Sequence, residues 1–252
     1  KLLRLVNSAH YARGDSIGTV SRAVVLVGFN GIRNMALSLV LLEHMQDKGN
    51  AHLLKEEFLR ALMAGSIASQ LGSTAKEGEE ALIGALFQNL GRMLSQFYFP
   101  EEADSIRKLE ASPREPISEE AASSRVLGIG FEALGLGIAK AWGLPEGIQR
   151  CIVRPPGLPP GRIPDDALER LRWRSRAGNE MADAMLHADP DEVQARLSQA
   201  VQTYQKSLGL SVDEMQAATV TARKKLVELA QAMDSNVRPN SRAAQLLQGA
   251  DA

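Results

Sequence analysis

Apolar residues recur every three or four positions along almost the whole of this 252-residue chain. Runs that could form strands are short, and they lack the alternation of apolar and polar residues that a half-buried strand needs. The three-to-four spacing gives each helix one apolar face, which must be buried against other helices. A chain of this length buries about 70–75% of its unfolded surface. We therefore expect an all-α fold, a compact multi-helix bundle.

Start and stop residues mark several of the expected helices. The run 118–128 begins with a serine and two glutamates and ends with a glycine, which predicts one helix. Pro100 begins another, which extends to Glu110. Ser211 and Glu214 have the spacing of a capping box and predict the start of a further helix. Residues 78–99 are the most apolar stretch, and we expect one uninterrupted helix there.

Prolines and glycines interrupt the helical pattern most clearly at residues 154–164. Their backbone requirements exclude a helix and favour an extended connection. We therefore expect a helical domain over residues 1–154, a connector over 155–164, and a C-terminal helical subdomain over 165–235 that packs on the first. Residues 236–252 have the composition of a flexible tail. The chain opens within a helical pattern, so we expect further helices upstream.

Composition limits the classes of function. The net charge is −1, which gives no general attraction to nucleic acid or to an anionic membrane. No run of about 18 apolar residues occurs, so no membrane span is predicted. Cys151 is the single cysteine, which excludes an internal disulfide and is typical of a reducing, cytoplasmic location. We expect Cys151 to be a small buried apolar residue.

Three segments contain motifs that belong together. Residues 2–9 read Leu-Leu-Arg-Leu-Val-Asn-Ser-Ala, and the run 17–34 follows them with Ala-x-x-Leu-x-Gly and a later Arg-Asn. Residues 81–94 contain Leu-Phe-Gln-Asn-Leu-Gly-Arg, and residues 139–148 contain Trp-Gly-Leu-Pro-Glu. Over residues 1–154 the chain resembles the HDOD family, the HD-related output domains of bacterial signalling proteins. The resemblance implies an HD-like helical bundle, here with additional C-terminal helices.

The resemblance also implies that the site has lost its chemistry. Active HD relatives carry adjacent His and Asp where this chain has Gln88 and Asn89, and a His often stands where it has Phe131. Near Ala61, where a first His ligand is usual, we find no His, Asp or Glu, and Val153-Arg154 replaces a frequent His pair. A neutral Gln-Asn pair lacks the imidazole and the carboxylate that hold a catalytic divalent ion. We expect no catalytic residue, no metal ligand and no cofactor.

The function implied by the resemblance is a non-catalytic output or scaffold module in bacterial signalling. Its expected partners are signalling proteins: a kinase, a receiver or a cyclic-dinucleotide circuit. One alternative is a divergent HD-type phosphohydrolase or a nucleotide-binding relic that uses the degenerate cleft of Gln88, Asn89 and Phe131. A second alternative is helix-turn-helix DNA binding by residues 19–42, although their second helix is too apolar to enter a groove.

A basic run in the C-terminal part mixes arginines with one tryptophan. It could form a face that binds a partner or an anion, with arginine stacked on the indole. It could equally be an ordinary solvated helix face whose arginines pair with nearby glutamates. The residues of this candidate face are Arg170, Arg172, Trp173, Arg174 and Arg176.

Overall fold

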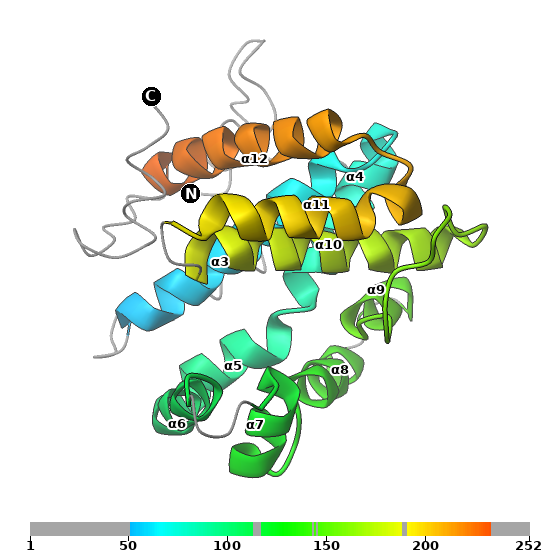
Figure 1. The fold of residues 1–252 in the computed structure, drawn as a ribbon. Coiled ribbons are helices and arrows are strands. Elements are labelled where there is room, and N and C mark those ends of the chain that lie inside the picture. The colour runs from blue at the N-terminus through cyan, green and yellow to red at the C-terminus, as the bar shows by residue number, and fades with distance from the viewer. Residues whose placement is uncertain (1–50, 113–116, 143, 145, 188–190, 233–252) are drawn as a thin grey trace.

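The computed structural model describes residues 51–112, 117–142, 144, 146–187 and 191–232. Every regular element within these ranges is an α-helix, which confirms the expected all-α class (Figure 1). The helices expected before residue 51, the segment 19–42 and the tail 236–252 lie outside the described residues. The helices are α3 (Ala51–Gln70), α4 (Ala75–Phe87), α5 (Leu90–Tyr98), α6 (Pro100–Glu110), α7 (Glu119–Leu127), α8 (Phe131–Ala141), α9 (Glu146–Ile152), α10 (Ala167–His187), α11 (Val193–Leu208) and α12 (Val212–Ala232).

Local signals set the ends of several helices as predicted. The backbone N–H of Ala121 donates to the hydroxyl of Ser118 at 3.2 Å, which caps α7, and Gly128 ends that helix at a φ of 74°. Helix α6 has the predicted bounds. At the start of α12 the backbone N–H of Ser211 donates to the carboxylate of Glu214 at 2.8 Å, and the backbone N–H of Glu214 donates to the hydroxyl of Ser211 at 3.2 Å, which is the expected capping box.

The expected uninterrupted helix over residues 78–99 is wrong, because the chain breaks at Gln88 and Asn89, between α4 and α5. The side-chain amide of Asn89 donates to the carbonyl of Ala85 at 2.9 Å, where an α-helix would place the backbone N–H of residue 89. That backbone N–H donates to Leu86 instead, three residues back. The side chain thus competes with the backbone for its helical acceptor and interrupts the helix.

The principal hydrophobic core joins helices from both sides of the Pro/Gly-rich connector. In Figure 1, α10, α11 and α12 lie together with α3 and α4 in one half of the molecule. Buried side chains of these five helices form a single cluster, which includes Met63 and Ile67 of α3, Met181 of α10, Tyr204 of α11 and Met215 of α12. The C-terminal helices therefore bury their apolar faces against α3 and α4.

Helices α5 to α8 form the other half in Figure 1, and the backbones of α5 and α8 approach each other closely. Gly91 of α5 lies against the backbone of α8, so a Cβ at this position would overlap the carbonyl oxygen of Phe131. Gly135 faces Gly91 from α8, where a Cβ would lie 3.0 Å from the backbone nitrogen of Gly91. Glycine at these positions allows the two backbones to touch.

Within the described ranges, no single helix combines the length and the apolar character needed to cross a membrane. The consecutive helices α7 and α8 reach those limits only when taken together, and they are bent by 70° relative to each other.

Candidate functional site

Three amide side chains meet in the interior, at the break between α4 and α5. Gln88, Asn89 and Asn179 of α10 are each no more than 6% exposed. The amide of Asn89 donates to Asn179 Oδ1 at 2.6 Å, and the amide of Asn179 donates to Gln88 Oε1 at 3.0 Å. The amide of Gln88 donates to the carbonyl of Cys151 at 3.0 Å. Each amide is thus held by a partner within the protein.

Arg60 of α3 completes this buried network. Its guanidinium donates to Asn89 Oδ1 through Nη1. It also forms a two-pronged ion pair with Asp183 of α10, through Nε to Oδ1 and through Nη2 to Oδ2, the latter at 2.6 Å. The Arg60 side chain is 3% exposed and that of Asp183 is 38% exposed. The guanidinium therefore lies inside the protein and ties α3 to α10 and to the helix break.

This set of groups does not fit a catalytic divalent metal ion. Among the described residues, no three His, Cys, Asp or Glu side chains lie close enough together to hold one. Asp183 shares Arg60 with Asn89, and both of its carboxylate oxygens already face the guanidinium of Arg60. The oxygen of Asn89 is engaged in the same way. A metal at this point would meet a fixed positive charge in place of negatively charged ligands.

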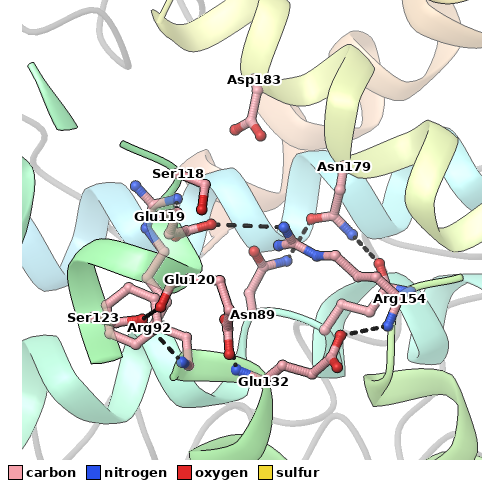
Figure 2. A network of polar contacts seen from close by, with 12 residues as sticks. Asn89, Arg92, Ser118, Glu119, Glu120, Ser123, Glu132, Arg154, Asn179 and Asp183 are labelled. Carbon is pink, nitrogen blue, oxygen red and sulfur yellow. Dashed lines mark hydrogen bonds and ion pairs between the residues drawn. The ribbon is translucent and has the colours of Figure 1, made fainter. Parts of the chain in front are cut away.

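A second network of charged side chains lies beside the first (Figure 2). Arg92 of α5 pairs with Glu57 of α3 at 2.9 Å and with Glu119 of α7 at 2.7 Å. Arg154, which follows α9, lies 3.6 Å from the other oxygen of Glu119. The backbone N–H of Arg154 also donates to Glu132 of α8 at 2.7 Å. Together these contacts connect four helices with the start of the connector.

Mutual attraction favours the charged forms of Glu119 and Arg92 despite their burial. Burial alone would raise the pKa of Glu119, but the guanidinium groups of Arg92, Arg60 and Arg154 outweigh it and hold that pKa below its ordinary value of 4.5. Burial alone would lower the pKa of Arg92, but Glu57 and Glu119 outweigh it and raise that pKa. The involvement of Arg60 in the pKa of Glu119 shows that the two networks share one electrostatic environment.

The predicted cleft residues are only partly brought together. Gln88 and Asn89 lie in the amide network, whereas Phe131 packs with Ile106 and Ala122 in a separate apolar cluster. Phe131 also lines a small hollow next to Arg92, with room for about one water molecule. The cleft, as the sequence defined it, is therefore two neighbouring environments, one of amides and one of aromatic and charged groups.

Cys151 is buried, as expected, and its side chain is 2% exposed. Burial raises the pKa of its thiol to about 11, so the thiol is protonated at neutral pH. Its part in the site is through the backbone carbonyl that accepts the hydrogen bond from Gln88.

The basic run of α10 does not form one exposed face. Trp173 and Arg174 are 3% and 5% exposed, and Arg174 pairs with Glu77 at 3.1 Å. The indole of Trp173 lies in the core, with the guanidinium of Arg176 5.4 Å from its ring centroid. The stacking of arginine on the indole, which was expected on an exposed face, thus occurs at the edge of the core.

The other arginines of the run fasten the Pro/Gly-rich connector, and Val153 just before it, to α10. Arg172 donates to the carbonyl of Val153 at 2.9 Å, and Arg176 donates to the carbonyls of Pro155 and Gly157 at 2.6 and 2.7 Å. Arg170 donates to the carbonyl of Pro164 at 2.9 Å. The connector lacks regular structure, so these bonds satisfy carbonyls that no helix or sheet satisfies. Binding of a partner or an anion by this run stays a prediction, now restricted to its half-buried arginines.

Replacing Asn179 by alanine is expected to lower the free energy of unfolding by about 2–3 kcal/mol, because two buried amides would each lose a partner. The amide nitrogen of Asn89 would lose an acceptor and the oxygen of Gln88 would lose a donor. Urea denaturation measures the change. Gln202→Ala, at an exposed position of α11, is the control and should change stability by no more than about 0.5 kcal/mol. Equal effects of the two substitutions would show that the amide network contributes nothing to stability.

Comparisons with known proteins agree with the fold and the motifs. The family model described as "HDOD domain" matches residues 1–155. An "Uncharacterized protein" of Treponema pallidum (strain Nichols) is 27% identical over 150 residues, which are 58% of this chain and 28% of that protein. The chain therefore spans little more than a quarter of that relative's length.

Two solved structures align with most of this chain. The "Putative phosphohydrolase" of Shewanella amazonensis SB2B has a TM-score of 0.58 at 19% identity, over 92% of this chain and 81% of that one. At this identity the likeness concerns the fold alone. The MmoQ response regulator of Methylococcus capsulatus str. Bath has a TM-score of 0.46 at 17% identity, over 86% of this chain and 81% of that one.

Proposed function

We propose that this chain, which belongs to the HDOD family, is a non-catalytic module of signal transduction that acts through contacts with other proteins. The observation that supports the proposal best is the buried amide network at Gln88 and Asn89. Polar groups in an active site must be free to meet a substrate, a metal or a reacting water. Here the amides of Gln88, Asn89 and Asn179 are bonded to one another and to backbone carbonyls.

The titratable groups near the network are also engaged. Arg60 is paired with Asp183, and Arg92 is paired with Glu57 and Glu119. The guanidinium groups hold the pKa of Glu119 below its ordinary value, whereas a general base needs a pKa nearer to the operating pH. These features suit a rigid scaffold better than an acid–base site.

Contacts with partner proteins need exposed apolar surface, and the junction of α5 and α6 offers some. Tyr98 and Phe99 are 62% and 47% exposed. Phe97 packs edge-on against Tyr98, with the ring centroids 4.6 Å apart. Clustered exposed aromatic side chains are typical of protein interaction sites.

Turnover of a phosphodiester tests the non-catalytic part of the proposal. The purified chain, incubated with an aryl phosphodiester and with Mn²⁺, Fe²⁺, Mg²⁺ or Zn²⁺ in turn, should release no more product than the buffer with metal alone. The Asp183→Asn variant, prepared in parallel, identifies activity from contaminants because such activity would persist in it. Turnover by the unaltered chain that the Asp183→Asn substitution abolishes would contradict the proposal.

Cross-linking tests the other part of the proposal, the contacts with other proteins. In cells of the native host, cross-linking should yield a protein partner in near-equal amount, and recovery of the uncomplexed chain alone would contradict the contact role.

A further inference from the structure

The cation that an HD-like scaffold would bind has a counterpart inside this chain. We propose that the guanidinium of Arg60 substitutes for a bound cation, and that positions 89 and 183 form a latent divalent-cation site which this guanidinium fills. The inference rests on the proposed function, since it explains how the scaffold keeps its shape without a metal. It also implies that the junction of α3, α10 and the α4–α5 break stays folded whether or not metal ions are available.

The contacts of Arg60 are those of a coordinated cation. All three of its guanidinium nitrogens are used, with oxygen acceptors from two separate parts of the chain: Asn89 at the α4–α5 break and Asp183 of α10. Arginine is suited to this role because its planar fork matches both oxygens of a carboxylate and its charge is permanent. A single buried positive group thus holds α3, α10 and the helix break together.

The burial of Arg60 distinguishes it from the exposed arginines of this chain. Its side chain is 3% exposed, and its neighbours Leu59 and Ala61 are buried in apolar clusters. A charged group at such a position is stable only when its partners are fixed around it. By contrast, Arg196 on α11 pairs with Glu192 at 2.8 Å with both side chains more than half exposed, and an exposed pair of this kind contributes little to stability.

The charges around Arg60 leave no place for a second cation. The direct contacts of Arg60 comprise its own guanidinium, one carboxylate, of Asp183, and one neutral amide, of Asn89. The balance is therefore zero, and an added divalent ion would bring two uncompensated charges. Removing Arg60 and placing a carboxylate at position 89 changes this local balance to minus two, which a divalent ion would neutralise.

The test compares four proteins by thermal unfolding, with and without millimolar Mn²⁺. In the Arg60→Ala/Asn89→Asp variant, Mn²⁺ should raise the Tm by about 5 °C or more, since a ligand that binds only the folded state stabilises it. The unaltered chain should shift by less than about 1 °C, and so should a triple variant that adds Asp183→Asn. Calorimetric titration should show one Mn²⁺ per chain in the double variant alone. The fourth protein, Arg196→Ala, controls for the loss of an exposed arginine and should not respond.

A folded double variant whose Tm does not change with Mn²⁺ would overturn the latent site while leaving the proposed function intact. Stoichiometric Mn²⁺ binding by the unaltered chain would overturn both. If the double variant is unfolded without metal, we expect Mn²⁺ to restore its helical circular dichroism, and failure to do so would also overturn the latent site.

A second, independent experiment replaces the missing guanidinium by a small molecule. Millimolar methylguanidinium should raise the Tm of Arg60→Ala but not of Arg196→Ala, and an equal response of the two would contradict the cation role of Arg60.

Discussion

Alanine at position 91 is expected to destabilise the protein by more than about 3 kcal/mol, above the usual range for overpacking. The added methyl group would overlap the backbone carbonyl of Phe131, and it would lie 3.1 Å from the backbone nitrogen of Gly135. Side chains can rotate away from a new methyl group, but backbone atoms can move only if the helices separate. Helices α5 and α8 would therefore move apart. Thermal and urea unfolding, monitored by circular dichroism, measure the loss.

Gly137 provides a matched control for Gly91. It lies in α8, and a Cβ there would meet no atom within 4 Å. Alanine at position 137 should therefore raise stability by about 0.5–1 kcal/mol, the ordinary gain from replacing glycine inside a helix. A Gly91→Ala variant as stable as the unaltered protein would show that α5 and α8 do not touch as the structure places them.

Replacing Arg92 by methionine is expected to cost about 3–5 kcal/mol at neutral pH, since Glu57 and Glu119 would lose the buried cation that they share. Among the described residues, only Glu119 keeps a second, more distant partner, in Arg154. The side chains of Arg92, Glu57 and Glu119 are 16%, 10% and 19% exposed, so water can replace little of the lost attraction. Methionine retains most of the apolar stem, which separates the loss of charge from the loss of packing. Arg150→Met, at an exposed pair with Glu146, is the control and should cost less than about 1 kcal/mol.

The cost of the Arg92→Met substitution should depend on pH. In the unaltered protein, the pKa of Glu119 is lowered on folding, so its contribution to stability is present above the unfolded value of 4.5 and is lost as the pH falls through the folded pKa. In the variant the largest attraction that lowers the pKa of Glu119 is gone and only those of Arg60 and Arg154 remain, so less of this pH-dependent stability is left. The difference between the two proteins should be largest near pH 7 and shrink toward about pH 4. A difference that stays constant over this range would contradict the charge-based explanation.

The sequence predicts those parts of the fold that depend on neighbouring residues. The bounds of α6 and the ends of α7 follow from Pro100, Ser118 and Gly128, which act within one turn of the helix. The break between α4 and α5 was missed because only part of its cause is local. Asn89 is held out of the helix in part by Asn179, which is 90 residues away in the chain.

In the candidate site, too, only some of the residues could be identified from the sequence. Gln88 and Asn89 stand out in the sequence because they occupy the positions of a family motif. Arg60, Asn179 and Asp183 belong to no such motif, and sequence reasoning missed them. A signal was present, since Arg60 interrupts a buried apolar run in α3 and Asn179 and Asp183 are one helical turn apart on α10. A polar residue at a core position indicates a partner, but only the tertiary structure identifies which one.

The basic run on α10 shows why a surface is difficult to predict from composition. Four arginines with one tryptophan resemble a binding face, but helical periodicity turns Trp173 and Arg174 inward. The remaining arginines donate to carbonyls of the connector, which carries no charge that the sequence could have paired with them.

The central claim is that the buried network of Arg60, Asn89 and Asp183 does not bind a metal ion. The metal content of the purified chain tests that claim most directly. The chain is produced in cells supplied with iron, manganese and zinc, purified without a chelator or an affinity tag that binds metal, and measured by plasma mass spectrometry beside its Asp183→Asn variant. We predict less than about 0.1 atom of any transition metal per chain in both proteins, since the acceptor oxygens of Asn89 and Asp183 already face Arg60. About one metal atom per chain in the unaltered protein, and none in the variant, would contradict the claim.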